Sequence, residues 1–289
     1  MPHTLGFRQV DVFATGPLTG NPLAVVHDAD DLTDAQMSAF AHWTNLSETT
    51  FLLRPTDPGA DYRVRIWTPG GELPFAGHPT LGTAHSWLEA GGEPRGAGRV
   101  VQECGVGLVT VRRDDSDDSD GDGAGRLAFA GPPLVRSGAV GPEDLAAIAR
   151  GLRVAVSDIV DAAWVDNGPG WVAARLRDAA AVLAVEPDLA AFGGLKIGVV
   201  GPYAPGESDA AVEVRAFVPD IGVAEDPVTG SLNAGLGEWL AGTFLPAEYV
   251  ASQGTVLGRR GRVHVRRDAD GVVWVAGDAV TTIQGTVTL

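Results

Sequence analysis

The chain has 289 residues, 45% of them hydrophobic, which is enough for a buried core and suits two domains of ordinary size or one large domain. Its 21 basic and 37 acidic side chains give a net charge of −16, which disfavours binding to nucleic acid and to anionic membrane surfaces. The single cysteine, Cys104, excludes an internal disulfide and a cysteine-based zinc site, and no apolar run is typical of a signal peptide or a membrane span, so we expect a cytoplasmic protein.

The predicted elements begin with strands and one helix. Alternating apolar and polar residues predict a strand over Phe7–Phe13, and a short apolar run predicts another over Leu23–Val26, after a turn rich in glycine and proline. Thr33 is placed to cap a helix that runs to about Trp43. Further helices are expected over Pro142–Gly151 and from Gly230 onward, besides one that starts at His78. The remaining strands are expected at 49–53, 62–68, 99–103, 107–113, 126–130, 162–165, 171–176, 195–200, 211–217, 262–267, 272–276 and 279–289.

A strongly acidic tract interrupts these elements. Residues 114–125 read DDSDDSDGDGAG and contain six aspartates, which predicts an exposed loop. Its second part resembles the start of a calcium-binding EF-hand loop, with Asp118, Asp120, Asp122 and Gly123 at the matching positions. The twelfth position of that loop would be Phe129 instead of the required glutamate, so we expect no metal site here.

A repeated motif is the most informative feature of the sequence. Arginine, an aromatic residue two positions later and proline four positions later occur as Arg65-Ile-Trp-Thr-Pro69 and again as Arg215-Ala-Phe-Val-Pro219. Downstream, Glu72-Leu-Pro-Phe-Ala-Gly77-His78 is matched by Glu225-Asp-Pro-Val-Thr-Gly230-Ser231 at an offset of 153, which Gly82 and Gly235 also keep. The unit of strand, loop, glycine and apolar helix therefore occurs twice, and we expect two similar halves.

Two such halves placed face to face would enclose a cleft and direct the N-terminus of each helix towards it. The unpaired N–H groups and the macrodipole of a helix N-terminus favour an anion, and the glycines let a ligand approach the backbone closely. These properties predict a small carboxylate as the substrate.

Three titratable residues are candidates for chemistry. His78 starts the first repeated helix, Asp226 precedes the second, and Glu48 lies in the polar segment Asn45–Phe51 before a strand. Each also has a structural interpretation: His78 as a capping or buried histidine, Asp226 as a turn residue and Glu48 as a local cap or surface acid. Ser231 is interpreted as an N-terminal helix cap in preference to a nucleophile, because no nucleophile elbow surrounds it.

The same residues resemble the PhzF family, named for phenazine biosynthesis, over nearly the whole chain. The resemblance is carried by Val10–Phe13, Gly20–Val25, Asn45–Phe51, Glu72–Ala84, Glu225–Ser231, Gln253-Gly254 and the region 275–280. The chain departs from the pattern at Leu232, where the family has a small residue. The family shares the fold of diaminopimelate epimerase, which implies an α+β protein of two pseudo-repeated halves, each a sheet wrapped around a central helix. The two catalytic cysteines of that epimerase have no counterpart here, which disfavours a thiol-based racemase.

The resemblance implies a cofactor-independent isomerase. It assigns the proton-transferring base to Glu48, substrate positioning and proton steering to His78 and Asp226, and carboxylate binding to Gly77, Gly230 and Ser231. A carboxylate shielded from water has a raised pKa, so it can both take and return a proton near neutral pH. The implied reaction is proton transfer and alkene isomerisation on a small cyclic unsaturated amino or hydroxy carboxylic acid similar to trans-2,3-dihydro-3-hydroxyanthranilate.

Two other functions stay open at this point. One is a two-base epimerase or racemase of a small amino acid that uses Glu48 and Asp226, and the other is a protein that binds small carboxylates without catalysis. The predicted halves are 1–125 and 126–275, with the strand at 276–289 able to return to the first half, as in the family. The resemblance also implies a homodimer.

Overall fold

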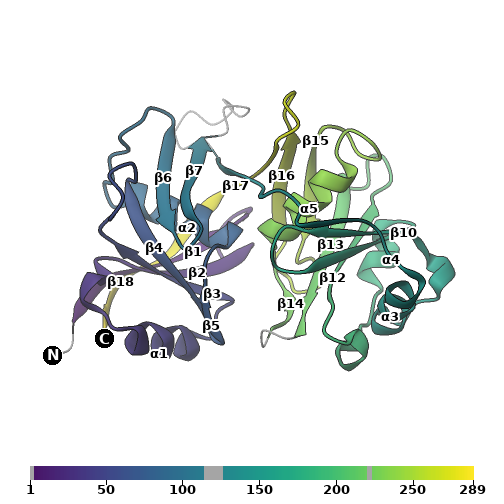
Figure 1. Ribbon diagram of the computed structural model, residues 1–289, viewed down its shortest axis with the longest axis horizontal. Helices are drawn as coiled ribbons and strands as arrows, with labels where there is room; N and C mark the ends of the chain where they lie inside the picture. Colours follow the sequence, from purple (N-terminus) through teal and green to yellow (C-terminus); the bar gives the residue numbers. More distant parts are fainter. Residues whose placement is uncertain (1–2, 114–125, 220–222) are drawn as a thin grey trace. The chain divides into compact units, whose positions relative to one another are not determined.

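The computed structural model describes residues 3–113, 126–219 and 223–289, so the acidic tract and its calcium-like motif lie outside the described residues. The chain forms two compact units, one made of 1–130 together with 276–289 and the other of 131–275 (Figure 1). The strand β17 (Val273–Gly277) leads from the second unit back into the first. Among the described residues, no helix has both the length and the apolar character needed to cross a bilayer.

The first unit is a mixed sheet packed on the helix α2. Its strands lie in the order β18, β1, β2, β3, β4, β6, β7, β8, with the short β5 paired to β4. The pairs β2/β3 and β4/β6 are parallel, and the helices α1 and α2 provide their crossover connections. The bounds are β1 (Thr4–Val12), β2 (Asn21–Val26), α1 (Asp34–Thr44), β3 (Glu48–Leu53), β4 (Tyr62–Thr68), β5 (Gly71–Leu73), α2 (Gly77–Glu89), β6 (Arg99–Cys104), β7 (Gly107–Arg113), β8 (Leu127–Ala130) and β18 (Ala279–Thr288).

The second unit repeats this plan around the helix α5. Its strands lie in the order β9, β10, β11, β12, β13, β15, β16, with β14 paired to β13, and the parallel pairs are β11/β12 and β13/β15. The bounds are β9 (Arg136–Ala139), α3 (Pro142–Leu152), β10 (Ile159–Asp166), β11 (Trp171–Leu176), α4 (Ala179–Leu183), β12 (Lys196–Pro202), β13 (Val212–Val218), β14 (Val223–Asp226), α5 (Gly230–Leu240), β15 (Glu248–Gln253) and β16 (Gly261–Arg267), with 3-10 turns at Ala29–Asp31, Val156–Asp158 and Leu189–Phe192.

The central helices explain the repeated glycines. Both helices are buried over most of their length, and each contacts several strands of its own sheet. Gly82 on α2 lies against Val12 and Leu23, and Gly235 on α5 lies against Val165, so each glycine lets a strand approach the helix closely. Val12 and Val165 are themselves separated by the offset that relates the two glycines. The predicted α+β fold of two pseudo-repeated halves, each a sheet around a central helix, is therefore confirmed.

The arginine and glutamate of the repeat have a structural role. Arg65 donates from Nε and Nη2 to the two carboxylate oxygens of Glu72, at 2.7 Å each, and Arg215 makes the same forked contact with Glu225 at 2.9 and 2.8 Å. Each guanidinium also lies over the aromatic ring two residues later, Trp67 or Phe217. The motif thus ties neighbouring strands together in each unit.

Candidate active site

Glu48 occupies a defined position at the start of β3. The helix α1 ends at Asn45, whose left-handed backbone (φ 53°) lets its N–H bond to the carbonyl of Ala41. The turn that follows delivers Glu48 as the first residue of β3, beside β2 on one side and β4 on the other. Its exposed fraction is 9%, so the structure does not support a surface acid.

His78 meets Glu48 from the first turn of α2. Thr83 of α2 donates a 2.9 Å hydrogen bond to Thr50 of β3, which holds the helix against that strand. As a result, Nε2 of His78 lies 3.3 Å from Oε2 of Glu48, although the two atoms are not aligned as a hydrogen bond. Among the described residues, Nε2 of His78 has no hydrogen-bond partner, so this histidine is buried without being satisfied.

The environment of His78 fixes its charge and its tautomer. Burial lowers the pKa of His78 from 6.5 to about 3, so the ring is neutral at neutral pH. Nδ2 of Asn21, the first residue of β2, lies 3.4 Å from Nδ1 of the ring, which makes Nδ1 the acceptor and leaves the proton on Nε2. The N–H of His78 is therefore directed to the side where the Glu48 carboxylate lies.

The lowered pKa of His78 makes the free energy of unfolding depend on pH. In the unfolded chain the histidine takes up a proton below about pH 6.5, whereas the folded state resists protonation down to about pH 3. The free energy of unfolding is therefore highest above pH 6.5, the pKa of the histidine in the unfolded chain. It falls as the pH drops below that value, by about 2 kcal/mol at pH 5. We expect urea denaturation to show this loss between pH 8 and pH 5 in the wild type and a smaller loss in His78→Gln. Equal losses in the two proteins would show that His78 titrates normally in the folded state.

In the second unit, a network of side chains holds Asp226 at the end of β14. The hydroxyl of Thr229 donates to Oδ2 of Asp226 at 2.5 Å, and Nε2 of Gln253 donates to that hydroxyl at 3.0 Å and to the backbone carbonyl of Asp226 at 3.1 Å. Gln253 is fully buried and also accepts from the N–H of Thr229 and from Asn233. The carboxylate of Asp226 is thus oriented by the side chain of Thr229.

Gly230 and Ser231 form the first turn of α5, as Gly77 and His78 form that of α2. Neither helix is capped by the side chain of its N-cap residue, because Ala76 has none to offer and the hydroxyl of Thr229 is used by Asp226. Nε1 of Trp171 donates to Oγ of Ser231 at 3.0 Å, which leaves the hydroxyl hydrogen of Ser231 as a donor. Ser231 therefore lies inside the helix start and is not its cap.

In both units a side-chain N–H from a strand contacts the second residue of the central helix, but only the first unit has the candidate base. Asn21 and Trp171 are the first residues of β2 and β11, and each presents an N–H to the second residue of the central helix of its unit. By contrast, β12, the counterpart of β3, reads KIGVVGP and has no acidic residue. Glu48 is thus an acid that only the first unit supplies at this strand.

The supporting residues Asn21, Thr229, Gln253 and Trp171 were not predicted as part of the site. Asn21 and Gln253 lie in motifs that the family resemblance singled out, but single residues in such motifs do not reveal which ring or carboxylate they contact. The feature that identifies Asn21 and Gln253 as supporting residues is their burial. Both are fully buried amides, and buried polar groups need hydrogen-bond partners.

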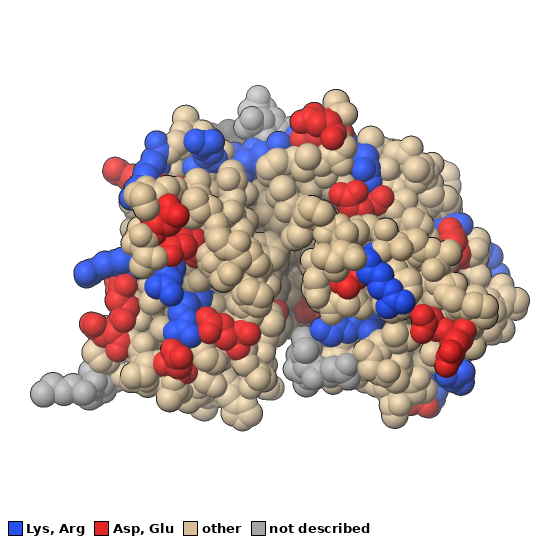
Figure 2. All heavy atoms as spheres, viewed as in Figure 1, with Lys and Arg blue, Asp and Glu red and all other residues tan. Residues whose placement is uncertain are grey.

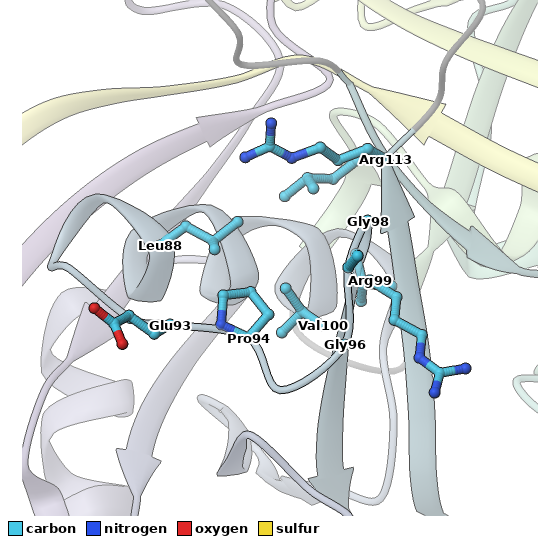
Figure 3. A pocket seen from close by; sticks show the side chains of 12 residues that line it. Leu88, Glu93, Pro94, Gly96, Gly98, Arg99, Val100 and Arg113 are labelled. Carbon is cyan, nitrogen blue, oxygen red and sulfur yellow. The ribbon is translucent and has the colours of Figure 1, made fainter.

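A separate hollow of about 550 Å³ lies at the other end of α2, in the first unit (Figure 3). Leu88, Pro94 and Val100 form much of its wall, and the side chains of Glu93 and Arg99 point away from one another at its edge. None of the predicted site residues lines it, and among its lining residues Glu93 is the only acid. Its residues therefore offer no pair of groups for proton transfer. Among the described residues, no three His, Cys, Asp or Glu side chains are grouped as a metal site.

Comparison with known proteins gives a consistent result. The family model described as phenazine biosynthesis-like protein (PhzC-PhzF) matches residues 10–285. The chain is 34% identical to Antisense-enhancing sequence 1 of Schizosaccharomyces pombe, over 96% of this chain and 97% of that protein. It is also 34% identical to trans-2,3-dihydro-3-hydroxyanthranilate isomerase of Pseudomonas chlororaphis, over 97% of this chain and 98% of that protein. The crystal structure of a PhzF family protein from Enterococcus faecalis shares the fold with a TM-score of 0.80 at 23% identity, covering 99% of this chain and all of that one.

Proposed function

Because this chain belongs to the phenazine biosynthesis-like (PhzC-PhzF) family, we propose that it is a cofactor-independent isomerase of a small cyclic unsaturated amino or hydroxy carboxylic acid. The substrate we propose is similar to trans-2,3-dihydro-3-hydroxyanthranilate, on which a relative with 34% identity acts by name. The observation that carries the proposal is the buried pair of Glu48 and neutral His78, 3.3 Å apart. As part of the same proposal, the enzyme works in the cytoplasm.

In this proposal Glu48 is the single base. Its carboxylate removes the proton from the hydroxyl-bearing carbon, the electrons of that C–H bond shift the double bonds of the ring, and the proton is returned to a carbon further along the conjugated system. The resulting enol then tautomerises to the ketone. The reaction rearranges one molecule, so no oxidant, reductant or second substrate is required.

The neutral ring of His78 suits this task. Its Nε2–H can donate to the carboxylate of Glu48 or to a substrate oxygen without adding a positive charge, which would hold Glu48 permanently ionised. Asn21 keeps the ring in this tautomer. A protonated histidine at the same distance would weaken the base, which gives the low pKa of His78 a functional reason.

Binding of the substrate carboxylate is assigned to Gly77, Gly230 and Ser231. The helix starts at Gly77 and Gly230 offer backbone N–H groups, and the Ser231 hydroxyl is left as a donor by Trp171. Asp226 is assigned to positioning the substrate and steering protons, with its carboxylate oriented by Thr229 and Gln253.

Proton NMR of the purified protein with trans-2,3-dihydro-3-hydroxyanthranilate in deuterated buffer tests the proposal. We expect the ring-proton signals of the substrate to be replaced by those of an isomer of the same mass, apart from exchanged deuterium. Recovery of unchanged substrate from the folded protein would exclude this compound, and the assay would then be repeated with other small unsaturated carboxylic acids.

The oriented carboxylate of Asp226 favours one alternative, an epimerase in which Glu48 and Asp226 act as two bases. Such an enzyme would incorporate solvent deuterium at a stereocentre and accept both enantiomers of a cyclic amino acid. The isomerase is expected to leave the optical purity of a recovered substrate unchanged, so chiral chromatography of the same reactions separates the two functions.

A further inference from the structure

Gln253 of β15 is a fully buried glutamine whose side-chain amide uses its whole hydrogen-bonding capacity. Its Oε1 accepts from the backbone N–H of Thr229 at 3.0 Å and from Nδ2 of Asn233 at 2.9 Å. Its Nε2 donates to the backbone carbonyl of Asp226 at 3.1 Å and to the hydroxyl of Thr229 at 3.0 Å. A glutamine amide has two donor hydrogens and two acceptor lone pairs, so all four are satisfied by neighbours in the second unit.

These contacts allow only one orientation of the Gln253 amide. A backbone N–H can only donate and a backbone carbonyl can only accept, so Oε1 must face the N–H of Thr229 and Nε2 must face the carbonyl of Asp226. The hydroxyl of Thr229 therefore receives a hydrogen from Nε2, and its own hydrogen is directed to Oδ2 of Asp226, 2.5 Å away. The two hydrogen bonds run in one direction, from Gln253 through Thr229 to Asp226.

This chain of hydrogen bonds is made by neutral groups that are shielded from water. Gln253 and Asn233 are fully buried and Thr229 is 7% exposed, whereas charged side chains are spread over the surface of the second unit (Figure 2). Reversing either hydrogen bond would leave a buried donor facing a donor or a buried acceptor without a hydrogen, and no solvent is at hand to compensate. The surrounding fold thus fixes the direction of the chain.

The duplicated fold places a glutamine at the same position of the first unit. Gln102 lies on β6, the strand that follows the central helix, as β15 does in the second unit, and it too is fully buried. Nε2 of Gln102 donates to Oγ1 of Thr80, the fourth residue of α2, at 3.0 Å. Gln253 accepts from Asn233, the fourth residue of α5. A glutamine that ties this strand to the central helix is therefore common to both units.

Only the second unit extends the contact of its glutamine to an acid. At the offset of 153 between the two helix starts, Thr229 corresponds to Ala76, which has no hydroxyl, and Asp226 corresponds to Leu73. The first unit thus ties its strand to its helix without either group. The hydroxyl of Thr229 is not needed for that structural role, which points to a role in the chemistry of Asp226.

We propose that Gln253 is a positioning residue that acts through Thr229 to keep Oδ2 of Asp226 as a hydrogen-bond acceptor, so that Asp226 exchanges protons at Oδ1. This inference rests on the proposed function, in which Asp226 positions the substrate and steers protons. A carboxylate that rotates presents either oxygen to a substrate, whereas one with a held oxygen presents the other in a single direction. Gln253 itself does not touch the substrate; it determines which oxygen of Asp226 does.

Thr229→Val interrupts the chain of hydrogen bonds at its centre and nearly keeps the shape of the residue. With trans-2,3-dihydro-3-hydroxyanthranilate as the substrate, we expect kcat to fall by about thirtyfold and KM to change little, because Asp226 loses the donor that orients it. Thr229→Ser keeps the hydroxyl and is expected to turn over like the wild type.

Gln253→Glu reverses the chain instead of interrupting it. It keeps an acceptor opposite the N–H of Thr229 but replaces the donor Nε2 by an oxygen, so the hydroxyl of Thr229 turns its hydrogen away from Asp226. We expect the same loss of kcat as in Thr229→Val. Gln102→Glu makes the matched change in the first unit and is expected to retain turnover, because the two hydrogen bonds described for Gln102 involve no acid.

Asp226→Ala separates a positioning role of Thr229 from a structural one. If Thr229 acts through Asp226, Thr229→Val costs no further turnover once Asp226 is replaced. In urea denaturation, the midpoint shift of the double variant should then be smaller than the sum of the two single shifts.

The denaturation cycle needs no substrate, so it decides this proposal even if the wild type leaves the compound unchanged, a result that would exclude the proposed reaction on this substrate. Additive midpoint shifts would overturn the proposal. A folded Thr229→Val or Gln253→Glu protein with the turnover of the wild type would overturn it as well.

Discussion

Glu48→Gln is expected to lower kcat for the isomerisation by about a thousandfold, with KM changed little. Glutamine has nearly the shape of glutamate but cannot accept a proton at neutral pH, and a positioned general base contributes roughly 10²- to 10⁴-fold to a rate. The NMR assay described above measures the loss directly.

Glu72→Gln is the matched control for this experiment. Glu72 is an acid of the same unit, but its carboxylate is held by Arg65 in the structural motif of the repeat. This variant is expected to retain turnover and to lose a modest amount of stability. Turnover of Glu48→Gln close to that of the wild type would remove Glu48 as the base. If the wild type and Glu48→Gln both bound the substrate carboxylate tightly and neither turned it over, the result would instead support a binding protein.

Gly235→Ala is expected to destabilise the second unit by about 3 kcal/mol, as overpacking of a rigid core does. The new methyl group would overlap the backbone carbonyl oxygen of Val165 on β10, and a backbone atom of a central strand cannot rotate away. The midpoint of urea denaturation, followed by circular dichroism, measures the loss.

Gly82→Ala, at the equivalent position of α2, should cost no more than about 1 kcal/mol. Its methyl group would lie 2.7 Å from Cδ2 of Leu23 and from Cγ2 of Val12, which are the ends of side chains and can shift. The higher helix propensity of alanine offsets part of the remaining cost. Similar losses for both variants would indicate that α5 moves as a whole to relieve the overlap.

The sequence predicted the long elements and the duplication well, because these leave local and periodic signals. The strand alternation around Val10, the Thr33 cap and the glycine-started helices all lie where expected. The short strands β5, β9 and β14, the strand β15 and the five-residue helix α4 were not predicted. In the short strands β5, β9 and β14 the pairing partner decides the conformation, and the local sequence carries little of that information.

The family resemblance assigned Glu48 and His78 to one candidate site, but neither the resemblance nor the spacing indicated that the two side chains lie next to one another. The two residues are brought together by the parallel pairing of β2 with β3 and by the contact of α2 with both strands, and neither is visible in the sequence. Leu232 is a second case in which a tertiary contact could not be predicted from the sequence. Its size departs from the family pattern, and the structure accommodates it against Gly198 of β12, which no local pattern connects with it.

The first unit is built from two stretches of chain that are far apart in the sequence, 1–130 and 276–289. During synthesis, β1 must therefore wait for β18 while the whole second unit is made, which takes roughly 10 to 30 s at the usual rate of translation. In that interval one edge of β1 has no partner, although its other edge can already pair with β2. The second unit is continuous and can complete its own sheet first. We therefore expect the second unit to finish folding before the first, although most of the first unit is synthesised earlier. The nascent protein is most exposed to aggregation at the strand it made first.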